Sequence, residues 1–223
     1  LVNGVLIPVT AFLIERFTTR QLFLTSMGLF SAGTLICAIA PDFTILLAGR
    51  VVQAAGAGIL MPLLMIVILT IFPIAKRGQA MGLIGLAMTF APAIGPTLSG
   101  WIVQNYSWRV LFYIVLPIAI IDFLIAIFLL KNVTKQTYPN IDIAGIILST
   151  LGFGGLLYGF SSAGNSGWGS VEVITAIIIG IITLSLFIWR QMTVKNPMLE
   201  FRVFQYNMFT LTTIINAIIT MAM

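Results

Sequence analysis

The sequence has no histidine, a single cysteine and few charged residues. Without histidine, neither histidine metal ligation nor a histidine proton relay can occur. Cys37 lies alone in an apolar run, so it supports neither a disulfide framework nor a metal site. No Gly-x-x-x-x-Gly-Lys-Ser/Thr loop is present to bind nucleotide phosphates. With no nucleophile–base pair or metal set, we expect no enzyme activity, no metal and no cofactor.

The low charge content also excludes a water-soluble fold. Charged residues make up 8% of the chain and hydrophobic residues 60%, whereas a soluble domain has about 25% charged residues. So few charges could not cover a surface that faces water, so we expect the lipid bilayer to be the main partner. The fold class is therefore predicted as all-α, a polytopic membrane protein, because helices satisfy their backbone groups in lipid.

Six apolar runs are long enough to cross the hydrocarbon layer, which needs about 20 residues. They cover residues 21–40, 43–72, 78–104, 108–130, 141–162 and 171–189. Shorter runs at the two ends, up to Ile14 and from about Met208, are predicted to be partial spans. We therefore expect an internal piece of a longer membrane protein.

The net charge of +5 comes from basic residues in short clusters rather than in one stripe, so nucleic-acid binding is not expected. Nine of the 11 basic residues fall in alternate loops, which should be cytoplasmic. These loops are 15–20, 73–77, 131–140 and 190–207. The nine residues are Arg16, Arg20, Lys76, Arg77, Lys131, Lys135, Arg190, Lys195 and Arg202.

Arg50 is the most informative single residue, because it lies inside an apolar run. It follows Phe43 by seven residues, which places it about 10 Å into the membrane. An arginine at the centre of a membrane helix costs about 2.5–3.5 kcal/mol, so it is expected to face a polar cavity or a partner. Gln53, Ala54, Ala57 and Gly58 share its helix face. The alternative is that Arg50 extends to the outer interface or only cross-links helices.

The run 78–104 carries a second signal. Small residues recur at every fourth position, which lets two helices touch closely, and two prolines kink the helix. This pattern favours a mobile interface between two bundles, and the alternative is a static packing seam. The small residues are Ala87, Ala91, Gly95 and Ser99, with Pro92, Pro96 and Gly100 on the adjoining stripe.

Acidic residues supply the remaining candidates. Asp122 lies about 21 Å along its span from Trp108, where a buried carboxyl could bind and release a proton; it could instead pair with a cation or approach the cytoplasmic side. Glu15, with Arg16 and Arg20, forms a charged turn that either closes a cytoplasmic mouth or is only a solvated topology signal. Asp142 and Glu172 are predicted to be ordinary acids at helix ends.

Three motifs together resemble the major facilitator superfamily, and in particular its fourteen-span drug:proton antiporter branch (EmrB/QacA-like). Residues 11–20 resemble the gate motif, with Ala11 and Thr18 where the family favours Gly and Glu15 where it has Asp. Residues 50–58 are similar to Arg-x-x-Gln-Gly-x-Gly-Ala, with Ala54 for Gly. Residues 91–101 resemble the antiporter motif closely. Its matching positions include Ala91, Pro92, Gly95, Pro96 and Gly100.

The resemblance implies a domain organisation and a function. Residues 1–130 would be spans two to six of the N-terminal bundle, 131–207 two extra central spans with flanking cytoplasmic loops, and 208–223 the start of the C-terminal bundle. The implied function is export of lipophilic, often cationic drugs in exchange for protons, by a monomeric multi-pass protein of a bacterial plasma membrane. Arg50 would take part in proton coupling. The alternatives are an exporter of a natural metabolite or amino acid, and a non-transporting membrane scaffold.

Overall fold

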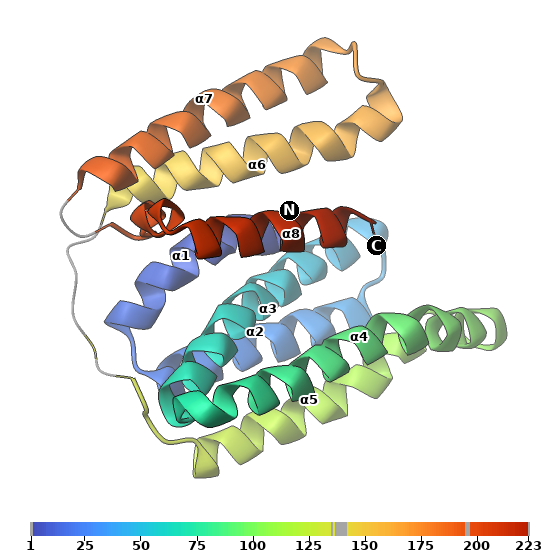
Figure 1. The fold of residues 1–223 in the computed structure, drawn as a ribbon. Helices are drawn as coiled ribbons and strands as arrows, with labels where there is room; N and C mark the ends of the chain where they lie inside the picture. The colour runs from blue at the N-terminus through green and yellow to red at the C-terminus, as the bar shows by residue number, and fades with distance from the viewer. Residues whose placement is uncertain (1, 135, 137–141, 195–196, 223) are drawn as a thin grey trace. The chain divides into compact units, whose positions relative to one another are not determined.

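The computed structural model describes residues 2–134, 136, 142–194 and 197–222, without the side chains of 7, 8 and 222, and its described elements are helices (Figure 1). In chain order they are α1 (Val2–Arg16), α2 (Thr19–Ile39), α3 (Phe43–Ile71), α4 (Ile74–Asn105), α5 (Arg109–Leu129), α6 (Ile143–Ser166), α7 (Val171–Thr193), the 3₁₀ helix η1 (Phe201–Gln205) and α8 (Asn207–Ala222). Six of them, α2 to α7, are long and apolar enough to cross a membrane. The all-α class and the six predicted spans are therefore confirmed, with ends that differ from the predicted ones by up to four residues.

Local sequence signals explain where the helices begin. Thr18 is the N-cap of α2 and forms a reciprocal capping box with Gln21. Asp42 and Ser170 accept a backbone N–H at the starts of α3 and α7. These polar caps satisfy the first backbone donors of each helix and separate one apolar run from the next.

The chain divides into two compact units, Leu1–Pro139 and Asn140–Met223. In the first unit α2 lies between α3 and α5, and α1 packs on α3. Glycines allow α2 and α3 to approach closely, because a Cβ on Gly33 would lie 2.4 Å from the backbone N of Gln53. A Cβ on Gly56 would likewise lie 2.4 Å from the carbonyl O of Ser26. This close approach brings side chains of α2 next to the polar face of α3.

Helix α4 has little contact with the rest of the first unit. Ile102 is its only buried residue in the described part of the chain, and residues 91–98 are exposed. Figure 1 shows α4 as a long helix beside α5. Its apolar surface therefore faces away from the other described helices of this unit.

In the second unit α6 and α7 form a hairpin, joined by a short turn at Gly167 (Figure 1). Gly167 has φ of 79°, a conformation that only glycine adopts without strain. The two helices touch through glycines, since a Cβ on Gly155 would lie 3.1 Å from the Cα of Gly180. Phe201 and Phe204 of η1 stack on each other, and Phe204 also contacts Phe209 of α8.

Candidate functional site

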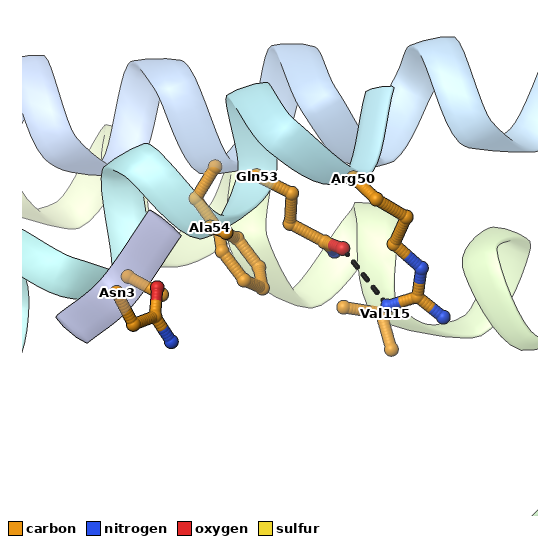
Figure 2. A pocket seen from close by; sticks show the side chains of 7 residues that line it. Asn3, Arg50, Gln53, Ala54 and Val115 are labelled. Carbon is orange, nitrogen blue, oxygen red and sulfur yellow. Dashed lines mark hydrogen bonds between the residues drawn. The ribbon is translucent and has the colours of Figure 1, made fainter. Parts of the chain in front are cut away.

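A cavity of about 470 Å3 in the first unit contains the intramembrane arginine. Helices α1, α2, α3 and α5 each contribute to its wall, and Figure 2 shows the lining side chains. The lining residues are Asn3, Phe30, Arg50, Gln53, Ala54, Ala57 and Val115. The structure therefore brings together four of the five residues of α3 that the sequence placed on one face. The fifth, Gly58, is buried against α1 and does not line the cavity.

A chain of hydrogen bonds holds Arg50 in this cavity. Its Nη1 donates to Oε1 of Gln53 over 3.1 Å (Figure 2), and Nε2 of Gln53 donates to the Thr34 hydroxyl of α2 over 2.8 Å. The guanidinium carbon also lies 4.8 Å from the centre of the Phe112 ring of α5, a cation–π contact. Arg50 is thus oriented by its own helix and by α5 while its side chain stays exposed.

This arrangement determines which chemical groups the cavity can bind. Arg50 is the only charged residue among the described lining residues, and a guanidinium has five N–H donors and no acceptor. One donor is used by Gln53. The remaining donors can bind a carboxylate, a carbonyl or another acceptor, while Phe30, Ala54 and Ala57 offer apolar contact.

Thr34, Phe112 and Asn3 are site residues that the sequence reasoning missed. Thr34 and Phe112 lie on other helices than Arg50, and no spacing rule connects residues across helices. An aromatic residue near an intramembrane arginine gives only a weak signal, because apolar runs contain many aromatic residues. Asn3, a polar residue in the first apolar run, could have been noticed in the sequence.

Asp122 is not part of this cavity. It lies on α5 with an exposed side chain, and no hydrogen bond or ion pair joins it to another described residue. The described helices of the first unit thus leave this carboxyl uncovered. Its coupling role stays a prediction.

The gate-motif residues lie at the ends of α1 and α2. Glu15 and Arg16 are exposed at the end of α1. Arg20 donates from Nη2 to the carbonyl O of Ile127 in the last turn of α5, and its backbone N–H donates to Asn132 over 3.1 Å. Arg20 therefore joins the start of α2 to the end of α5, where the last carbonyls of a helix need donors.

The antiporter-motif residues all lie on the exposed part of α4. Ala91, Pro92 and Pro96 are exposed, and a Cβ added to Gly95 or Gly100 would meet nothing within 4 Å. The small-residue surface that the sequence predicted is present, but no other described helix of the first unit covers it. Its role as a moving interface stays a prediction.

Asp142 has more partners than the sequence indicated. It caps α6 as expected, and it also accepts hydrogen bonds from Arg190 of α7 at 2.8 Å and from Gln191 at 3.2 Å. The Oε1 of Gln191 in turn accepts the backbone N–H of Met198. Burial raises the pKa of this carboxyl, but the bonds from Arg190, Gly145 and Gln191 outweigh burial and hold it below its ordinary value. We call Asp142, Arg190 and Gln191 the hairpin clasp.

Comparison with known proteins gives a consistent result. The model of the Major Facilitator Superfamily matches residues 1–223. The chain is 60% identical to an uncharacterized MFS-type transporter, YcnB, of Bacillus subtilis over 98% of this chain and 46% of that protein. It is 52% identical to the lincomycin resistance protein LmrB of Listeria monocytogenes over 95% of this chain and 45% of that protein. It is 35% identical to the probable multidrug resistance protein EmrY of Escherichia coli over 94% of this chain and 41% of that protein.

The chain thus spans less than half the length of these relatives. Its apolar helices and its bacterial relatives identify a multi-pass protein of the plasma membrane. The matched family consists of transporters rather than enzymes. Together with the six spans, the family match over the whole chain leads to one conclusion: this chain belongs to the Major Facilitator Superfamily.

Proposed function

We propose that the full-length protein containing this chain exports lipophilic drugs, often cationic ones, across the plasma membrane in exchange for protons, and that it works as a monomer. The observation that carries the proposal is the placement of Arg50 inside a membrane helix, at an otherwise uncharged cavity. A charge at this depth is costly unless it serves a pathway. The resistance proteins among the relatives support drugs as the cargo.

Each part of the chain has a proposed role. Arg50 and Gln53 form the polar end of the drug pathway, and Asp122 carries a proton. Glu15, Arg16 and Arg20 close the cytoplasmic end. The small-residue surface of α4, with Gly95 and Pro96, slides against the other half of the transporter during export. The carboxylate that a cationic drug needs would come from outside the described cavity, whose only charge is positive.

A second candidate, export of a natural metabolite or amino acid, is favoured by this same positive charge. A carboxylate on such a metabolite would bind Arg50 through two parallel N–H donors. A scaffold without transport is not favoured, because it gains nothing from an arginine in the membrane.

Reconstitution tests the proposal. The full-length protein is placed in liposomes with an imposed proton gradient, and the movement of lincomycin, ethidium and a set of amino acids is measured together with proton movement. Drug movement that requires the gradient and is accompanied by a counterflow of protons supports drug:proton exchange. Movement of amino acids alone would favour the second candidate.

A further inference from the structure

We infer that Thr34 is a positioning residue for the drug pathway: its buried hydroxyl fixes the Gln53 amide, which in turn orients the Arg50 guanidinium toward the cavity. Thr34 lies on α2, and it is not one of the residues that line the cavity. The inference rests on the proposed function, because it takes the cavity to be the place where the drug binds.

Burial and hydrogen bonding single out this hydroxyl. Thr34 has no exposed surface, and its Oγ1 donates to the carbonyl O of Phe30 over 2.7 Å. A hydroxyl has one proton to donate, so toward Gln53 it can only accept. Nε2 of Gln53 supplies the matching donor at 2.8 Å.

The direction of the Gln53 amide follows from these two bonds. An amide has its donors on nitrogen and its acceptor on oxygen. Since Thr34 takes the nitrogen side, the oxygen side faces Arg50, which can only donate and lies 3.1 Å away. Gln53 itself is 9% exposed, so water has little access to replace Thr34 as the acceptor. The three side chains therefore form one chain of hydrogen bonds that runs in one direction: Arg50 donates to Gln53, and Gln53 donates to Thr34.

The backbone keeps this chain short. Gly33, the neighbour of Thr34, faces α3 so closely that a Cβ there would lie 2.7 Å from the Cα of Gln53. From the side of α3, a Cβ on Gly49 would likewise lie 2.7 Å from the Sγ of Cys37 on α2. The close contact of α2 and α3 lets the short side chain of Thr34 reach Gln53.

Another buried hydroxyl of this unit, that of Thr10, lacks such a side-chain partner among the described residues. Thr10 of α1 is also fully buried and donates to the carbonyl O of Leu6, one turn earlier in the same helix, over 2.8 Å. No side chain among the described residues donates to its oxygen. Thr10 is thus a matched control: it has the same residue type, the same burial and the same bond within its helix, but no connection to Arg50.

The test compares Thr34→Val, Thr34→Ser and Thr10→Val in the full-length protein, reconstituted in liposomes with a proton gradient. The KM of transport is measured for lincomycin or ethidium, whichever the wild type exports, because KM does not depend on the amount of active transporter. Valine keeps the shape but removes the hydroxyl, so we expect KM to rise about fivefold, the effect of one lost neutral hydrogen bond. Serine should restore the wild-type KM, and Thr10→Val should not change it.

The outcomes separate the inference from the proposed function. A wild type that exports neither probe overturns the proposed function. A wild type that exports a probe, together with an unchanged KM in Thr34→Val, overturns the inference. If Thr34→Val does not accumulate, Thr34→Cys replaces it: its thiol is a weak acceptor, so an intermediate KM supports the inference and a wild-type KM overturns it. Gln53→Met should raise KM as much as Thr34→Val does, and a smaller rise contradicts the single chain of bonds.

Discussion

Arg50 is held by its hydrogen bond to Gln53 and by the Phe112 ring, and its planar shape matters for both contacts. A lysine keeps the charge but loses the flat fork that can bond Gln53 and a second acceptor while lying over a ring. We expect Arg50→Lys to lower the initial rate of drug:proton exchange at least about tenfold. In free energy this loss is close to that of one hydrogen-bonded contact to a charged group, about 1.5–3 kcal/mol. The measurement is the rate in liposomes at matched protein amounts.

Arg109 supplies the control for this prediction. It also lies over an aromatic ring, with its guanidinium carbon 4.4 Å from the centre of Trp108, and it donates to the carbonyl O of Ala40. It is not among the residues of the Arg50 cavity. Arg109→Lys should therefore leave the rate within about twofold of wild type. A wild-type rate in Arg50→Lys would indicate that Arg50 only extends to the interface.

Asp122 yields a prediction about coupling. An amide cannot alternate between charged and neutral forms as a carboxyl does. We expect Asp122→Asn to reduce proton-driven drug export while drug binding, measured by quenching of tryptophan fluorescence, stays near the wild-type value. Equal losses of binding and export would assign Asp122 to the structure of α5 instead.

Among the site residues, the sequence could predict those that share one helix. Arg50, Gln53, Ala54 and Ala57 follow from helical spacing and from the cost of a membrane-embedded charge. Thr34 could not be predicted in the same way, because its bond to Gln53 depends on how closely α2 and α3 approach.

At the scale of the helix, α4 offers a clear experiment. Valine at Gly95 meets no atom of the described chain, so it should not disturb the folding of this unit. If the small-residue surface slides against another part of the transporter, Gly95→Val should abolish drug export while the amount of protein in the membrane stays normal. Export and membrane content are measured together.

Gly82 is the matched control on the same helix. A Cβ there also meets nothing within 4 Å, and its position is roughly opposite to Gly95 around the helix. Gly82→Val should therefore retain export. Full export by Gly95→Val would show that the small-residue surface is an ordinary packing surface and does not slide. Equal losses of export in both variants would show that valine acts through its lower helix propensity.

The hairpin clasp gives a prediction about stability and pH. The pKa of Asp142 lies below its ordinary value of 3.8. The clasp therefore contributes fully at neutral pH, and its contribution is lost progressively as pH falls from that ordinary value through the lowered one. Asp142→Asn removes the ion pair at any pH. Because the Arg190 side chain is 39% exposed, we expect a modest loss of about 1–2 kcal/mol, seen as a lower unfolding temperature in detergent.

The exposed pair Arg202–Glu200 is the control for the clasp. Its atoms are 3.6 Å apart, and both side chains are about half exposed. Glu200→Gln should change the unfolding temperature very little. An equal change in both variants would contradict a specific contribution from the clasp.

The helices themselves could largely be predicted from hydropathy, because lipid leaves the backbone few alternatives to a helix. Ends were harder to predict. The run expected at 171–189 continues as helix to Thr193, since Arg190 and Gln191 are held by Asp142 rather than by water. The sequence identified Asp142 as a helix-end acid, but its partner lies 48 residues away and no local pattern connects them.

For the whole molecule, the distribution of basic residues predicts which ends of the helices face the cytoplasm. We expect a cysteine at Lys76 to be protected from an impermeant reagent in intact cells and a cysteine at Ser166 to be labelled. Ser166 is chosen because the neighbouring Gly167 has a positive φ and would not tolerate a side chain. Both variants carry Cys37→Ala, and the reverse labelling pattern would contradict the orientation.

The three-part organisation at 1–130, 131–207 and 208–223 stays an expectation. The first compact unit ends at Pro139, nine residues beyond the expected end of the first part. Two of the sequence-predicted cytoplasmic residues, Lys135 and Lys195, lie outside the described residues. Family and fold class followed from the sequence because both depend on patterns along the chain, whereas the arrangement of the helices depends on contacts between them.

The glycine contacts of the α6–α7 hairpin also bear on the order in which the protein is made. Gly155 meets Gly180 and Gly159 meets Ile177, so these partners leave the ribosome within seconds of each other. The contact between Arg20 and Ile127 joins residues 107 positions apart. Helices α6 and α7 can therefore pair as soon as both are synthesised. The face of α2 that contacts α5 stays exposed to lipid until α5 has been inserted into the bilayer.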